Sequence, residues 1–129
     1  LNSIIGDDDR ISFSNDYVLE ENVAGILRNS DVVVLPFTKV TNSSSAILAF
    51  SMKKPIIAPR IGMIKDFPED TGIYYNQNNN IGLRKAMMYA QQSKHKLEVL
   101  SRKAYAYAKS LDWGTIASNT QRVYASLLT

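Results

Sequence analysis

The sequence DVVVLPFTKVTNSSSAILAFSMKKPIIAP, residues 31–59, decides the fold. It contains two short apolar runs, Val32–Leu35 and Ile56–Ala58, and each is closed by a proline. Unbroken apolar runs of this length are typical of strands buried on both faces of a parallel sheet. Between the runs, Asn42–Ser45 offer capping side chains ahead of the helix-like segment Ala46–Phe50. The stretch therefore predicts a strand, a helix and a second strand, which is the repeating unit of a parallel α/β sheet.

The same alternation continues on both sides of this stretch. Upstream, Ile11–Phe13 alternates as a strand does, and Leu19–Asn29 places apolar residues at helical spacing. Downstream, Gly72–Tyr75 predicts another strand, and the chain from about residue 83 reads as helices, the last of them capped by Asp112. We therefore predict an α/β fold with a Rossmann-like parallel sheet, flanking helices and a helical C-terminal region.

Composition limits the function classes. The 129 residues fit one domain, residues 1–129, and 45 % apolar with 21 % charged residues is ordinary for a globular chain. The absence of cysteine excludes disulfides, thiolate metal sites and a cysteine nucleophile, and His95 is the single histidine. No apolar run approaches the ~20 residues of a membrane helix. We expect a cytoplasmic protein.

The charge is divided unevenly along the chain. Residues 1–79 carry seven Lys/Arg and ten Asp/Glu, whereas residues 80–129 carry eight and two, so the net charges are −3 and +6. The basic charges are spaced, which favours an ordinary solvated helix surface. Contact of residues 84–109 with an anionic membrane, and hence a peripheral membrane location, stays open as an alternative.

In an open parallel sheet, ligands bind beyond the carboxyl ends of the strands. The loop Pro36–Ser45 follows one strand and leads into a helix N-terminus, where backbone N–H groups and the helix dipole favour an anion. Asn42, Ser43, Ser44 and Ser45 add polar side chains there, so a phosphate or diphosphate is the predicted ligand. The alternative is that Asn42 or Ser43 only caps the helix.

Two further loops follow predicted strands and are candidate ligand-binding sites. Asn15, Asp16, Tyr17 and Val18 follow the Ile11–Phe13 strand and could seat a ring. In the loop Arg60–Met63, Gly62 allows close backbone approach and Arg60 could pair with a phosphate.

Other functional sites are poorly supported. Asp7–Asp9 lacks the glycine and terminal glutamate of a calcium loop, so no metal site is predicted. Aromatic residues do not alternate with the basic ones, so we expect no nucleic-acid partner.

In their order, these segments resemble the C-terminal, nucleotide-sugar-binding half of a GT-B glycosyltransferase of family 4. The resemblance covers about residues 10–129. It rests on Asn29–Pro36, which is similar to the family's "a-D-v-v-v-l-P", and on Ser43–Ala58, which is similar to "S-g-s-a-l-l-A-l-s-x-g-r-P-V-I-a". Gly62, Asp70–Tyr75 and the closing Trp113…Tyr124 segment follow in the family's order.

The resemblance implies a transferase that uses a nucleotide-diphosphate sugar as substrate, without a further cofactor. It implies that Asn42, Ser43, Ser44 and Ser45 contact the diphosphate through backbone amides and hydroxyls. It also implies that Asn15–Val18 lie near the base. The residues implied near the sugar or phosphates are Phe37, Thr38, Arg60, Gly62 and Met63.

Two departures from the family pattern matter. Many members carry a Glu-x7-Glu pair, and the corresponding positions here are Val40 and Leu48, so this chain is closer to a branch that lacks the pair. The Arg and Lys that usually stabilise the leaving diphosphate lie upstream of residue 1. No catalytic residue is assigned, and we expect a fragment that lacks the N-terminal acceptor domain and is inactive alone. The alternative is a non-catalytic α/β interaction module that has lost nucleotide binding.

Overall fold

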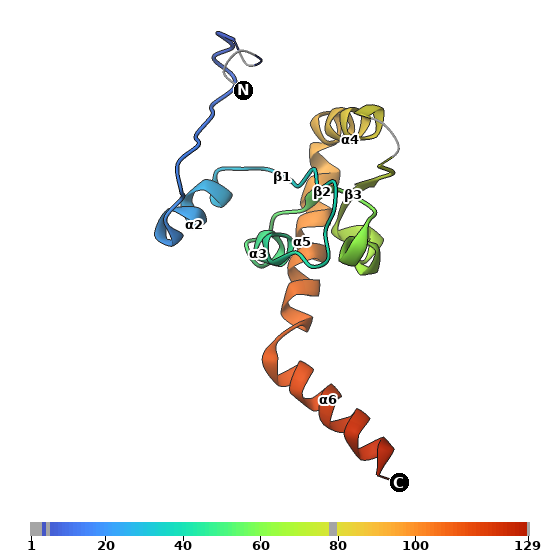
Figure 1. Cartoon of the computed structure of the whole chain (residues 1–129). Helices are drawn as coiled ribbons and strands as arrows, with labels where there is room; N and C mark the ends of the chain where they lie inside the picture. The colour runs from blue at the N-terminus through green and yellow to red at the C-terminus, as the bar shows by residue number, and fades with distance from the viewer. Residues whose placement is uncertain (1–3, 5, 78–79, 129) are drawn as a thin grey trace.

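The computed structural model describes residues 4, 6–77 and 80–128. Three parallel strands form its sheet in the order β1 (Val33–Val34), β2 (Ile56–Pro59) and β3 (Gly72–Tyr75) (Figure 1). Val33 pairs with Ile56 across β1 and β2, and Ile57 pairs with Ile73 across β2 and β3. All four residues of the central strand β2 are buried, as the apolar runs predict. The predicted α/β fold class with a parallel sheet is confirmed.

Helices connect and flank the strands. The segments before and between the strands form helix α2 and helix α3, and short 3₁₀ turns precede β3; the remaining helices follow it. Their bounds are α2 (Glu20–Arg28), α3 (Ser44–Ser51), η1 (Gly62–Asp66), η2 (Glu69–Thr71), α4 (Asn80–Gln92), α5 (Lys94–Ser110) and α6 (Trp113–Leu127). The predicted cap of the last helix is also confirmed, because the Asp112 side chain accepts a hydrogen bond from the backbone N–H of Thr115 at 3.0 Å.

One face of the sheet carries an aromatic core under α3 and α5. Phe50 of α3 is fully buried, and its ring meets the rings of Phe67 and Tyr107 edge to face at 5.3 and 6.1 Å between centroids. Ile56 and Ala58 of β2 point into the same cluster. Aromatic pairs in this arrangement add stability beyond that of buried area, so this core fixes α3 and α5 against the sheet.

The opposite face is covered by α4 and the first part of α5. Ile57 of β2 packs there against Ala86 and Ala90 of α4 and against Leu97 of α5. Figure 1 shows α3 and α4 on opposite sides of the strands. Helices therefore lie on both faces of the sheet. In sheets of this architecture, ligands bind beyond the carboxyl ends of the strands.

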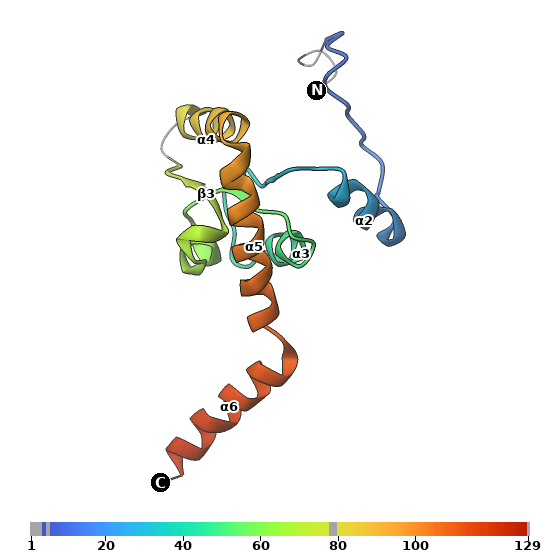
Figure 2. The ribbon, with the colours of Figure 1, turned by 180° about the vertical axis from the view of Figure 1, so that it is seen from behind.

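Three segments lie outside this packed body. Helices α2 and α6 have no buried residue, and Figures 1 and 2 show both standing away from the sheet. Residues 11–13 are extended and exposed but pair with no strand in the described part of the chain, so the predicted first strand does not form here. A strand needs a neighbouring strand for its backbone N–H and C=O groups, and the described residues place no strand beside this segment. Within the described residues, no helix combines the length and apolarity that crossing a bilayer requires.

Candidate functional site

The loops that follow the three strands meet at one edge of the sheet. The Gln77 side-chain amide, just after β3, donates to the carbonyl oxygens of Phe37 and Thr38, in the loop after β1, at 3.0 and 2.8 Å. The backbone N–H of Arg60, just after β2, donates to the carbonyl oxygen of Tyr75 at 2.9 Å. We call this edge the carboxyl rim; it comprises residues Pro36–Ser45, Arg60–Met63 and Asn76 with Gln77. Two of the three loops predicted to bind a ligand therefore lie together at one edge of the sheet.

Gly62 holds two of these loops in contact. Its φ is +49°, a conformation that side-chain-bearing residues rarely adopt. A Cβ atom at this position would lie 1.8 Å from the carbonyl oxygen of Val40, so a larger residue would push the loops apart. The side chains of Phe37 and Met63 pack partly against the aromatic core, while Thr38 is exposed. The close approach predicted for Gly62 is thus an approach to the neighbouring loop.

The serine run begins helix α3 at the rim. Ser43 is the N-cap residue, and its side-chain oxygen accepts a hydrogen bond from the backbone N–H of Ala46 at 3.2 Å. Its hydroxyl is buried, whereas Asn42, Ser44 and Ser45 are exposed. The first turn of α3 contains no acidic residue, so its positive dipole end is not neutralised from within the helix. Within the run, Ser43 therefore serves as the helix cap, and the side chains of Ser44 and Ser45 in the first turn are left exposed.

Arg60 is held by its own neighbourhood. Its Nη1 donates to the carbonyl oxygens of Ile64, Lys65 and Phe67 at 3.2, 3.3 and 3.1 Å, respectively. The guanidinium also forms an ion pair with Glu69 and lies over the ring of Tyr74, 4.1 Å from its centroid. With 19 % of the side chain exposed, Arg60 mainly stabilises the turn η1, which limits what its charge can offer to a phosphate.

The Tyr74 hydroxyl beside Arg60 stays protonated well above neutral pH. Burial raises the pKa of Tyr74 to about 12, and the hydrogen bond between Tyr74 and Thr71 and the charge of Arg60 oppose the rise. The hydroxyl oxygens of Thr71 and Tyr74 are 2.5 Å apart. The Tyr74 hydroxyl therefore has a structural role and does not ionise near pH 7.

Asn15–Val18 lie away from the rim. The segment is irregular and exposed, with Tyr17 87 % exposed, and Figure 1 shows the chain entering α2 there, well separated from the sheet. The structure brings together the loops after β1 and β2 but leaves this third loop apart. Sequence reasoning named Val40 only as a position of the family's carboxylate pair and did not single out Gln77, although Gln77 lies two residues after the predicted strand Gly72–Tyr75.

The two positions of the family's carboxylate pair are apolar and differently placed. Val40 is half-buried against the aromatic core and touches Gly62, while Leu48 is 46 % exposed on α3. Neither offers a hydrogen-bond acceptor for a ribose. Among residues 4, 6–77 and 80–128, no three His, Cys, Asp or Glu side chains gather closely enough to hold a metal ion.

Neither the family models nor the curated proteins include a match to this chain. Among solved structures, it is similar to sucrose-phosphate synthase from Thermosynechococcus elongatus, with a TM-score of 0.76 and 22 % sequence identity. The two chains share a fold. The similarity covers 94 % of this chain and 31 % of the other, so this chain spans about a third of the length of the sucrose-phosphate synthase chain.

Proposed function

We propose that this chain is the donor-binding part of a glycosyltransferase, which moves a sugar from a nucleotide-diphosphate sugar to an acceptor. The observation that carries the proposal is the exposed first turn of α3 at the carboxyl rim, at the end of the loop whose Val40 contacts Gly62. The fold shared with sucrose-phosphate synthase supports the assignment to a glycosyltransferase. The chain contains one donor-binding domain, and a preceding domain brings the acceptor.

The diphosphate lies at the N-terminus of α3. Backbone N–H groups of the first turn donate to its oxygens, and the exposed hydroxyls of Ser44 and Ser45 add donors. The partial positive charge of the helix end stabilises the phosphate charge. Asn42 flanks this turn, and the buried Ser43 keeps it in place by capping.

The sugar lies over the loops after β1 and β2. Thr38 is exposed beside this space, and the backbone around Gly62 forms its floor against Val40. Because its guanidinium is engaged by carbonyl groups and Glu69, Arg60 acts mainly by shaping this loop. The base is bound by Asn15–Val18, which requires this segment to approach the rim from its position beyond α2.

Transfer also requires positive charge on the leaving diphosphate and a base for the acceptor hydroxyl. We assign neither to a residue of this chain, so the 129-residue chain binds nucleotide weakly and transfers no sugar by itself. Measurable sugar transfer by this chain alone would refute the second statement.

Calorimetry with uridine, guanosine and adenosine diphosphates tests the donor site. One of them should bind, and Ser44→Ala combined with Ser45→Ala should weaken it several-fold. Ser51→Ala is the matched control, since Ser51 is an exposed serine at the other end of the same helix. No heat with any of the three in a folded sample would favour the alternative, an α/β interaction module without nucleotide binding.

A further inference from the structure

Helix α4 carries apolar side chains on the face that it turns away from the sheet. Ala86 and Ala90 define its inner face, since they are buried against Ile57 of β2. Ile81 and Met88 are about two helical turns apart, so they point in the same direction, and the helical period places that direction nearly opposite the two alanines. Their side chains are 54 and 47 % exposed. The outer face of α4 therefore differs from that of an ordinary solvated helix, which is polar there.

Two cations flank this apolar pair. Arg84 and Lys85 lie about one turn from both Ile81 and Met88, and the helical period places them on either side of the line that joins the pair. Both cationic side chains are exposed, and neither takes part in an ion pair within the described residues. Two positive charges are thus available beside two exposed apolar side chains.

The start of α5 adds a cation that is held in place. The Nζ of Lys96 donates to the hydroxyl oxygen of Tyr89 at 2.6 Å and lies 5.0 Å from the centroid of its ring. Tyr89 directly follows Met88 and is 41 % exposed. We call the combined surface the α4 patch; it comprises Ile81, Arg84, Lys85, Met88, Tyr89 and Lys96.

The apolar surface continues beside Tyr89 and Lys96. A cavity of about 420 Å³ lies there, and Ile73 of β3 and Val99 of α5 contribute to its lining. The carboxylate in this lining belongs to Glu69, which is paired with Arg60. The α4 patch therefore borders a largely apolar hollow whose acidic group already has a cationic partner.

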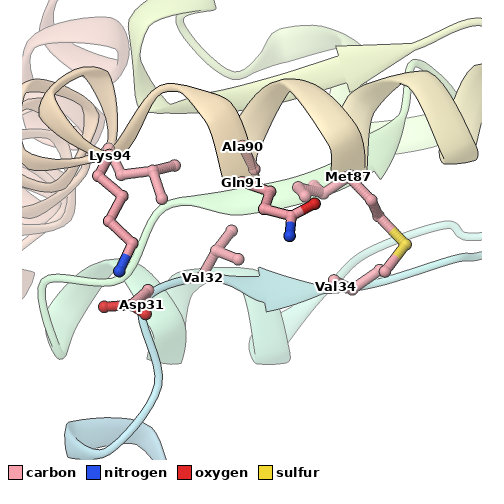
Figure 3. Close-up of a pocket in the computed structure, with 9 residues that line it drawn as sticks. Asp31, Val32, Val34, Met87, Ala90, Gln91 and Lys94 are labelled. Carbon is pink, nitrogen blue, oxygen red and sulfur yellow. The ribbon is translucent and has the colours of Figure 1, made fainter.

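The other side of α4 belongs to a different feature. Figure 3 shows Met87 and Gln91 above β1, at a pocket of about 220 Å³, with the Lys94 side chain directed toward Asp31. These side chains border the sheet edge, so we do not include them in the α4 patch.

The charge along the sequence follows the same division. No Asp or Glu occurs between Asp70 and Glu98, whereas the rest of α5 presents charges of both signs. The exposed charged residues of that part of α5 are Glu98, Arg102, Lys103 and Lys109. The combination of exposed apolar side chains with cations alone is therefore specific to α4 and the first turn of α5.

The shape and charge of the α4 patch favour one kind of partner. Figures 1 and 2 both show α4 at the end of the packed body opposite α6, with no other described element lying over it. A protruding helix does not suit a small molecule, which binds in a concavity. A second copy would bring like charges together, and lysine is depleted at protein interfaces. Apolar side chains among Lys and Arg, with a tyrosine beside them, are typical of surfaces that bind anionic membranes.

We propose that the α4 patch binds the surface of an anionic phospholipid membrane. Ile81 and Met88 enter the boundary between headgroups and acyl chains, while Arg84, Lys85 and Lys96 contact lipid phosphates. The contact is confined to residues 81–96, a narrower surface than the whole of residues 84–109 that the charge distribution suggests. It requires no nucleotide, so the inference does not rest on the proposed function.

Co-sedimentation of the 129-residue chain with vesicles tests the charges. Vesicles of equal parts phosphatidylcholine and phosphatidylglycerol should bind the chain, and vesicles of phosphatidylcholine alone should bind it at least about tenfold more weakly. Arg84→Gln combined with Lys85→Gln should weaken binding to the anionic vesicles at least about tenfold, since each cation near such a surface contributes about fivefold. Arg102→Gln combined with Lys109→Gln removes the same charge from the rest of α5 and should weaken binding about twofold or less.

A second pair of variants tests the apolar side chains. Ile81→Ser combined with Met88→Ser leaves the charge unchanged and should also weaken binding to the anionic vesicles at least about tenfold. Because both positions are exposed, the urea midpoint should change little. Unchanged vesicle binding by this variant would mean that no side chain enters the membrane, which would overturn the proposal.

Tryptophan fluorescence measures the insertion without depending on loss of binding. In a Trp113→Phe background, Met88→Trp should shift its emission to the blue with anionic vesicles and be quenched by brominated acyl chains. Ala106→Trp, at an exposed position of α5 outside the patch, should show neither change. Equal quenching of both probes, or of neither, would contradict binding through the α4 patch.

The remaining outcomes also decide the matter. Equal affinity for the two kinds of vesicle, or full competition by the soluble polyanion heparin without a shift of the Met88→Trp emission, would overturn the proposal. Nucleotide binding in calorimetry without vesicle binding would reject this inference and leave the proposed function intact. Vesicle binding by a chain that binds no nucleotide would do the reverse.

Discussion

Helices α5 and α6 follow each other in the sequence and carry similar apolar patterns, but they differ in what covers those patterns. Leu97 and Ala104 of α5 are buried, whereas α6 has no buried residue and leaves Trp113 86 % exposed. A helix of 15 residues without packing is marginal in water. An amphipathic pattern therefore identifies the helix face that requires a packing partner, but it does not show whether the same chain provides that partner.

The largest effect should come from the core beneath α5. Phe50→Ala removes a fully buried ring that contacts Phe67 and Tyr107, and should lower the free energy of unfolding by about 3–5 kcal/mol in urea denaturation. Tyr124→Ala, on the exposed face of α6, should change it by less than about 0.5 kcal/mol in the 129-residue chain. Similar losses of unfolding free energy in both variants would contradict the difference between α5 and α6, since they would show that α6 is packed against another element in solution.

Glycine-to-alanine substitutions in the carboxyl rim and in α2 should have opposite effects on stability. Gly62→Ala should destabilise by about 1–3 kcal/mol, because the Cβ meets the Val40 carbonyl and φ is positive. Gly25→Ala, in the middle of α2 with nothing within 4 Å of the added atom, should instead stabilise by up to about 1 kcal/mol. Thermal denaturation of both variants measures the difference. A neutral Gly62→Ala would contradict the packing of the two rim loops.

A third contrast compares a covered charge with an exposed one. Arg60→Lys should cost about 1–3 kcal/mol in urea denaturation without nucleotide, because lysine cannot reproduce the contacts with three carbonyl oxygens and Tyr74. Lys103→Met removes an exposed pair with Asp70 at 3.7 Å and should cost less than about 0.5 kcal/mol. An Arg60→Lys variant of unchanged stability would return Arg60 to the role of a free phosphate ligand.

The smallest effect at neutral pH concerns Tyr74. Its pKa is raised from 10.0 in the unfolded chain to about 12 in the fold, so the folded state holds the phenolic proton more tightly. The resulting stability is fully present below pH 10 and is lost as the pH rises toward 12. Urea denaturation between pH 9 and 11.5 should show a steeper loss for the native sequence than for Tyr74→Phe. Parallel pH profiles would mean that Tyr74 is not buried as described.

Much of the fold could be predicted because its strongest signals are local. The runs Val32–Leu35 and Ile56–Ala58 form β1 and β2. Ser43 caps α3, which is one of the two roles that the sequence predicted for the serine run. Ile11–Phe13 has the alternation of a strand but pairs with no strand among the residues that the structure describes. Pattern specifies the faces of a strand, and pairing requires the rest of the sheet.

The site was predictable to a lesser extent. Topology places the loops after β1 and β2 at one edge, so their proximity follows from the strand order. The contacts of Gly62 with Val40 and of Arg60 with Glu69 depend on loop conformations that local propensity does not specify. For the same reason, whether an arginine after a strand faces a ligand or its own turn could be learned only from the structure.

The proposed binding of a diphosphate at the first turn of α3 is tested by the substitution Ser45→Glu. A carboxylate there should stabilise the helix by about 0.3–1 kcal/mol through the dipole while repelling the ligand. We predict a slightly higher urea midpoint and at least a tenfold loss of nucleoside diphosphate affinity by calorimetry. Ser51→Glu, at the opposite end of α3, should leave affinity unchanged. Unchanged nucleotide affinity in Ser45→Glu would contradict diphosphate binding at this helix end.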